Sequence, residues 1–198
     1  MSRRVRAALI WGGLGLVLFL PLFAALDSPL LAYRRPVYIA AGVAGVLGLM
    51  VLAVQPLLAR GVLPGMSLLQ SRRVHRWAGG ALVLAVVAHV VGLWITSPPD
   101  VIDVLLLRSP TPFSIWGVAA MWALFASALL AAFRRRLGLR LWRQIHRGLA
   151  LVVTGGTVIH ALQIEGTMAP LSKAALCFFA VAALLWAVTA RNSAQRPR

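Results

Sequence analysis

Six long apolar runs constrain the fold of this 198-residue chain more than any other feature. Each run approaches or exceeds the roughly 20 residues that an α-helix needs to cross the hydrocarbon core of a bilayer. Because backbone groups inside hydrocarbon must be hydrogen-bonded within their own segment, the runs predict helices rather than strands. The predicted fold class is therefore all-α, a polytopic membrane bundle of six transmembrane helices. The expected spans are residues 7–26, 37–58, 77–95, 113–133, 145–164 and 171–190.

The segments between these runs are short, and the longest of them is residues 59–76. We therefore expect a single transmembrane domain over residues 1–198 and no soluble domain. The sequence MSRRVR before the first run also fits the charged start of a signal peptide. That run is longer than the roughly 7–15 apolar residues typical of a signal peptide, and its removal would leave five spans. The first run is therefore interpreted as a retained helix.

Basic residues are distributed very unevenly between the two sides of the predicted membrane. With the N-terminus in the cytoplasm, the cytoplasmic side receives 16 of the 20 Lys and Arg residues, and the other side receives the remaining four and all four acids. This asymmetry follows the positive-inside rule and predicts that both termini are cytoplasmic. Attraction to anionic lipid is a secondary consequence. The mean hydropathy of +0.87 excludes a nucleic-acid-binding protein, which needs a large water-facing basic surface.

The four histidines of the chain form two pairs with identical spacing. His89 lies on the third run and His75 lies just before that run on the same predicted helix. His146 and His160 lie on the fifth run, and in each pair the second histidine is at position i+14 from the first. On an α-helix this spacing is about 3.9 turns, so both side chains lie on one face, about 21 Å apart along the axis. If both helices start at the cytoplasmic side, His75 is level with His146 and His89 with His160. We call these the inner pair and the outer pair.

Two facing imidazoles are the ligand set of a bis-histidine haem iron, a coordination that suits electron transfer better than oxygen binding. Two such layers would hold two haems across the membrane. The absence of C-x-x-C-H predicts non-covalent haem b. A single intramembrane histidine is often only a polar contact between helices. Two matched pairs favour metal ligation by His75, His146, His89 and His160.

Arginines accompany both inner histidines, because the third and fifth runs each begin with the pattern R-x-x-H-R. An Arg three residues before a His lies on the same helix face, and guanidinium groups pair well with carboxylates. Arg72 and Arg143 are therefore the first candidates to bind haem propionates, followed by Arg76 and Arg147. Topology alone also explains arginines on a cytoplasmic surface.

The two histidine-containing peptides resemble the paired-histidine helices of ferric reductase-like transmembrane domains. The peptides are HRWAGGALVLAVVAHVVGLW, from His75, and HRGLALVVTGGTVIHAL, from His146. That family includes ferric reductases, NADPH oxidases and the haem-binding membrane subunit of the bacterial methionine sulfoxide reductase system. The resemblance covers residues 37–190. It implies six helices with haem ligands on the third and fifth, so that all four histidines carry over as ligands.

Many members of that family continue into FAD- and NAD-binding domains, whereas no G-x-G-x-x-G follows a predicted strand here. We therefore expect an oxidoreductase subunit that needs a separate donor, either a flavoprotein reductase carrying FMN or FAD, or membrane quinol. The expected function is electron transfer through two stacked haems to an acceptor on the outer side. The expected location is the inner (plasma) membrane of a bacterial cell, as a multi-pass protein in the lipid bilayer.

Two other functions fit parts of the sequence. One is a quinol-linked cytochrome b that anchors a dehydrogenase or hydrogenase. The donor that reduces the haem distinguishes this function from the ferric reductase-like function. The other is a haem-free transporter that uses the histidines as a proton path and would be colourless. All four acids fall outside the six runs, which disfavours the transporter.

Overall fold

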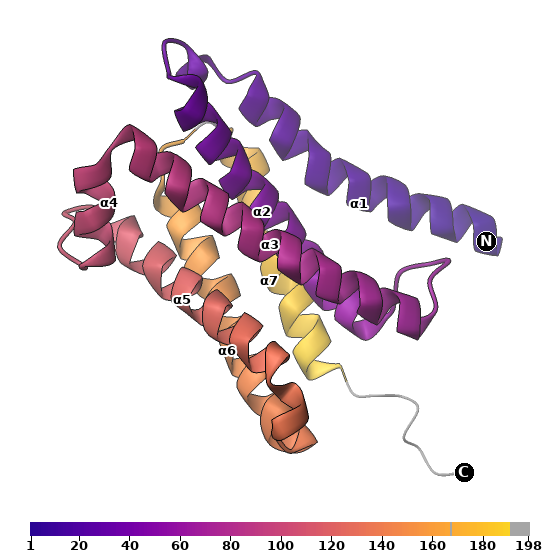
Figure 1. Cartoon of the computed structure of the whole chain (residues 1–198). Coiled ribbons are helices and arrows are strands. Elements are labelled where there is room, and N and C mark those ends of the chain that lie inside the picture. Colours follow the sequence, from indigo (N-terminus) through magenta and orange to yellow (C-terminus); the bar gives the residue numbers. More distant parts are fainter. Residues whose placement is uncertain (167, 191–198) are drawn as a thin grey trace.

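The computed structural model describes residues 1–166 and 168–190, and this part of the chain is all helical. Six of the helices are long and apolar enough to cross a membrane, which confirms the predicted fold class (Figure 1). Two short 3-10 turns and one short helix lie between them. The elements are α1 (Arg3–Leu26), η1 (Pro29–Leu31), α2 (Pro36–Arg60), α3 (Leu68–Thr96), α4 (Pro98–Leu105), α5 (Pro112–Ala132), η2 (Arg134–Arg136), α6 (Leu139–Gln163) and α7 (Pro170–Thr189).

Local sequence signals explain where several helices begin. Helices α2, α4, α5 and α7 each carry a proline in the first turn, where the missing N–H costs nothing. Helix α3 begins at Leu68, well before the predicted start of its apolar run, because Ser67 and Gln70 form a capping box. The Ser67 hydroxyl accepts from the Gln70 N–H, and the Gln70 side chain accepts from the Ser67 N–H.

The long helices form two closely packed antiparallel pairs, α2 with α3 and α5 with α6. Figure 1 shows the two pairs side by side, with α1 at one edge of the bundle. Across the described residues, α3 approaches α5 at few positions, and α3 and α6 do not pack closely. Helix α7 packs on both α2 and α6, so it is the element that joins the two pairs.

The main apolar cluster lies where α7 meets α2. Ala53 is fully buried there, beside Leu49, Met50, Leu176 and Cys177. Cys177 is a free thiol within this cluster, as expected for a small apolar packing residue.

Glycines bring the helices of each pair close together. A Cβ at Gly92 of α3 would lie 2.7 Å from the Ala41 Cβ of α2. In the other pair, a Cβ at Gly156 of α6 would lie 2.8 Å from the Trp116 carbonyl oxygen and 3.1 Å from the Ala120 Cβ of α5. Both contacts are shorter than carbon atoms tolerate, so each pair depends on glycine at its crossing point.

The antiparallel helices place the charged groups at two opposite ends of the bundle. We define the arginine-rich end as the start of α1, the α2–α3 loop, η2 and the start of α6. The opposite end carries η1, α4 and the α6–α7 loop, and Figure 1 shows the two ends at opposite corners of the molecule. The four acids lie at this opposite end, at Asp27, Asp100, Asp103 and Glu165.

Candidate functional site: two histidine pairs between α3 and α6

The structure brings the four histidines together as two pairs that face each other between α3 and α6. The ring centroids of the inner pair, His75 and His146, are 6.3 Å apart with ring planes at 86°. The outer pair, His89 and His160, lies further along the same two helices. All four side chains are half-buried.

Each histidine is held by a hydrogen bond through its Nδ1 to the partner helix of its own pair. On α3, His89 Nδ1 lies 2.8 Å from the Ala41 carbonyl oxygen, and His75 Nδ1 lies 3.2 Å from that of Gln55. On α6, the corresponding acceptors are on α5. His160 Nδ1 lies 2.9 Å from the Phe113 carbonyl oxygen, and His146 Nδ1 lies 3.0 Å from the Ser127 Oγ.

These contacts bear on which nitrogen of each ring carries the proton. A carbonyl oxygen only accepts, so the Nδ1 of His89 and of His160 must be the donor. The lone pair of these two neutral imidazoles is then on Nε2. His75 Nδ1 contacts both the carbonyl oxygen and the side-chain amide of Gln55, and the amide nitrogen can donate to it. A ring whose Nδ1–H is held by a carbonyl is the arrangement typical of histidine metal ligands. The hydroxyl of Ser127 can donate or accept, so it is able to take the same proton from His146 Nδ1.

The acceptors repeat the spacing of the histidines. Gln55 is at position i+14 from Ala41 on α2, and Ser127 is at position i+14 from Phe113 on α5. The α2–α3 pair and the α5–α6 pair therefore have the same construction. In each pair, the first helix supplies two acceptors and the second helix supplies two histidines.

Two glycines leave the space that the rings of the outer histidines occupy. A Cβ at Gly117 would lie 2.7 Å from His160 Nδ1, and a Cβ at Gly45 would lie 3.0 Å from His89 Nδ1. Each glycine is one helical turn after the acceptor of the ring that it touches, since Gly45 follows Ala41 and Gly117 follows Phe113 at position i+4. Only the absence of a side chain lets each ring lie this close to the neighbouring backbone.

Sequence reasoning missed the groups that hold the rings. Backbone carbonyls carry no sequence signature, and glycines are common in membrane helices. Gln55 could have been found from the sequence, because it is the one side-chain amide in its apolar run. In the structure its side chain is buried, with 8% exposed. Its amide also contacts α3 at His75 and Gly79.

The four arginines singled out from the sequence lie at the arginine-rich end, next to the inner pair. Arg72 and Arg76 flank His75 on α3, and Arg143 and Arg147 flank His146 on α6; all four are exposed. The structure therefore places them near the inner pair and leaves the outer pair without neighbouring arginines on its own helices.

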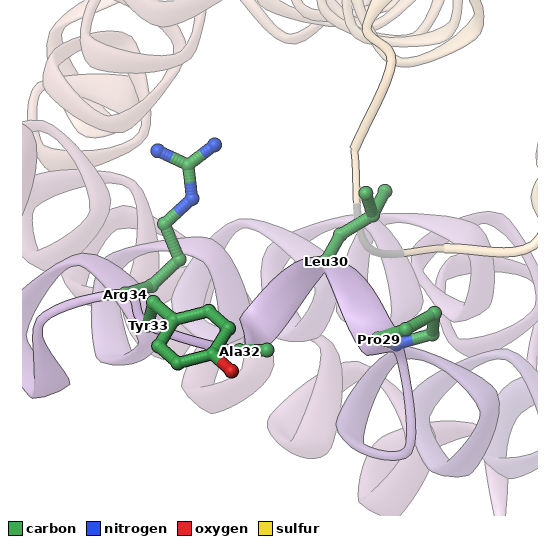
Figure 2. A pocket seen from close by; sticks show the side chains of 5 residues that line it. All are labelled: Pro29, Leu30, Ala32, Tyr33 and Arg34. Carbon is green, nitrogen blue, oxygen red and sulfur yellow. The ribbon is translucent and has the colours of Figure 1, made fainter.

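No cluster of three His, Cys, Asp or Glu side chains forms within the described ranges. A metal held by one of the histidine pairs would therefore need ligands from outside the protein. A separate open pocket lies on the loop between α1 and α2 (Figure 2). It is lined by Pro29, Leu30, Ala32, Tyr33 and Arg34 and includes no predicted site residue.

Comparison with protein families gives one match. Residues 41–157 match the family described as the ferric reductase like transmembrane component. The matched segment includes His75, His89 and His146 and ends shortly before His160. No curated protein and no solved structure matches the chain.

Proposed function

Because the chain belongs to the ferric reductase-like transmembrane component family, we propose that it transfers electrons across a membrane through two stacked haem b groups. The inner pair, His75 and His146, would ligate one iron, and the outer pair, His89 and His160, would ligate the other. The observation that carries the proposal is that all four rings are anchored through Nδ1, which leaves each Nε2 for a metal.

The inner pair has the separation that this ligation needs. Metal–imidazole bonds are about 2.0–2.1 Å long, and the centroid of an imidazole lies about 1.15 Å from each ring atom, given bond lengths near 1.33 Å. Two imidazoles on opposite sides of one metal therefore have centroids about 6.4 Å apart. The inner pair has 6.3 Å. Porphyrin nitrogens would complete a coordination that two histidines alone cannot fill.

Bound haem supplies a one-electron Fe(III)/Fe(II) couple at each pair. The residues of the chain orient the ligands and set their basicity. The Ala41 and Phe113 carbonyls polarise the Nδ1–H bonds of His89 and His160, which makes Nε2 a stronger donor to iron. A metal held by two histidines at each pair would suit electron transfer better than oxygen binding. The exposed arginines beside the inner pair would neutralise haem propionates.

The charge asymmetry supports an orientation in which the arginine-rich end faces the cytoplasm. Electrons would enter there from a separate flavoprotein or from membrane quinol, and leave at the opposite end. Reporter fusions after residues 60 and 108 test this orientation. A fusion after residue 60 should be cytoplasmic, and one after residue 108 should be on the outer side. The reverse pattern would exclude electron entry from the cytoplasm.

The direct test is a reduced-minus-oxidised absorption spectrum of the purified protein, with haem counted per chain. We expect close to two b haems in the wild type and one in either His75→Ala or His89→Ala. Gly42→Ala is a matched control, because a Cβ there meets nothing within 4 Å. A colourless protein after expression with haem supplied would overturn the proposal in favour of a haem-free transporter.

Reduction experiments on the same purified protein identify the class of electron donor. Reduction of both haems by a quinol in detergent would favour the quinol-linked cytochrome b. Reduction only with a flavoprotein reductase and its nicotinamide substrate would favour the ferric reductase-like function.

A further inference from the structure

The indole nitrogen of Trp142 is a buried donor without a partner. Among the side-chain N and O atoms of the described residues, it is the one that is both fully covered and without a hydrogen bond. Buried donors in folded proteins are nearly always paired, because leaving one unpaired costs the full loss of its hydration. The position of Trp142 Nε1 therefore indicates an acceptor that is not among the described residues.

The same side chain is held against the inner histidine pair. Trp142 lies in the first turns of α6, one turn before His146, and its backbone N–H donates to the Gly138 carbonyl at 2.9 Å. Its indole stacks on the His146 ring with centroids 5.4 Å apart and planes within 7°. This stacking fixes the direction of the indole N–H beside a proposed metal ligand.

The missing acceptor has a definite chemistry. An indole N–H only donates, so the partner must be an acceptor. The charged side chains in this part of α6 are Arg140, Arg143 and Arg147, which are donors. The four acids of the chain all lie at the opposite end of the bundle.

We propose that Trp142 Nε1–H donates a hydrogen bond to a propionate carboxylate of the haem held by the inner pair. This inference rests on the proposed function. It gives Trp142 a role that differs from that of the arginines. The exposed arginines act on a propionate from the water side, whereas Trp142 reaches it from the buried side and fixes its position.

The test is a redox titration of the haem-loaded protein, comparing wild type with Trp142→Phe. The phenylalanine keeps an aromatic ring against His146 and removes the donor, together with part of the stacked ring. Without the donor, the negative propionate favours the ferric state, so the midpoint potential of one haem should fall while that of the other stays unchanged. Trp122→Phe is the control, because Trp122 lies on α5 and contacts Phe125; both potentials should equal those of the wild type.

A second arm identifies the acceptor. Membranes made without haem are loaded with haem or with an iron porphyrin that carries ethyl groups in place of the propionates. The effect of Trp142→Phe should disappear with the propionate-free porphyrin. An effect that persists would overturn the inference and assign it to the stacking on His146 or to a lipid phosphate. Equal potentials in wild type and Trp142→Phe with ordinary haem would also overturn it.

A measurement on the wild-type protein tests the same contact without a variant, so its result does not depend on the folding of Trp142→Phe. Ultraviolet resonance Raman spectra report the hydrogen-bonding state of indole N–H groups. We expect one more hydrogen-bonded indole after loading with haem than after loading with the propionate-free porphyrin. Identical indole signals in the two loaded forms would refute the propionate contact even though both proteins bind porphyrin. A protein that binds no porphyrin would instead refute the proposed function.

Discussion

Gly117→Ala should selectively weaken the outer haem site. The added Cβ would lie 2.7 Å from His160 Nδ1 and 2.8 Å from Cε1, whereas ordinary contacts begin near 3.4 Å. The ring must therefore retreat by about 0.7 Å to restore an ordinary van der Waals separation. Its Nδ1–H bond to the Phe113 carbonyl, now 2.9 Å, would lengthen to about 3.6 Å, which is no longer a hydrogen bond.

The magnitude follows from three effects. Overpacking costs about 1–3 kcal/mol, and the lost hydrogen bond costs about 0.5–1.5 kcal/mol. Replacing glycine by alanine inside a helix returns about 1 kcal/mol. The net penalty on the ligated arrangement is about 2 kcal/mol, which corresponds to roughly 30-fold weaker haem binding at the outer pair.

Gly45→Ala provides a graded comparison. Its Cβ would lie 3.0 Å from His89 Nδ1, so the ring retreats by about 0.4 Å. The bond to Ala41 lengthens from 2.8 Å to about 3.2 Å, still within hydrogen-bond range. The assay is haem content per chain during stepwise dilution of haem-loaded protein in detergent. We expect loss in the order Gly117→Ala, then Gly45→Ala, then Gly42→Ala. Retention by Gly117→Ala equal to that of Gly42→Ala would refute the reasoning.

Three further substitutions test the surroundings of the site. Ser127→Ala removes the acceptor of His146 Nδ1, a loss of about 0.5–1.5 kcal/mol, and should shift the midpoint potential of the inner haem alone in a redox titration. Gly92→Val places a branched side chain at the α2–α3 crossing and should destabilise the protein by about 1–3 kcal/mol, seen as a lower Tm. An unchanged Tm would show that the helices can separate there without cost. Lys173→Met removes the 2.6 Å hydrogen bond that Nζ donates to the Ile164 carbonyl at the end of α6. A stability loss near 1 kcal/mol would lower the Tm by about 2–4 °C. An unchanged Tm would mean that water replaces the ammonium group as the donor.

The apolar runs were sufficient to predict six helices, because a membrane span must be both long and apolar. They placed the start of the third helix at Trp77, whereas the structure begins it at Leu68. Hydropathy cannot detect a polar helical extension outside the hydrocarbon. The S-x-x-Q pattern at Ser67 and Gln70 does carry that information, because it satisfies two N–H groups at a helix start.

The histidine spacing predicted that His75 would lie level with His146, and the rings of these two residues do meet, since an i, i+14 separation fixes both the face and the height on a helix. It could not predict what holds the rings. Three of the four acceptors are backbone carbonyls, at residues such as Ala41 and Phe113 whose side chains have no part in the contact. Gly117 drew no attention in the sequence, because its role depends on a ring from another helix. Trp142 was interpreted only as an interfacial aromatic residue, since nothing in a sequence reveals an unpaired donor.

The weak contact between the two helix pairs affects how long the protein would persist in a membrane. The helices of each pair pack closely on one another, and α7 is the main contact that keeps the two pairs together. A ligand bound between α3 and α6 stabilises the joined arrangement by mass action. If that ligand is haem, as proposed, chains made during haem shortage would lack this stabilisation, and less stable chains are removed faster by proteases. The amount of protein in the membrane would then follow the supply of its cofactor, without any regulation of its synthesis.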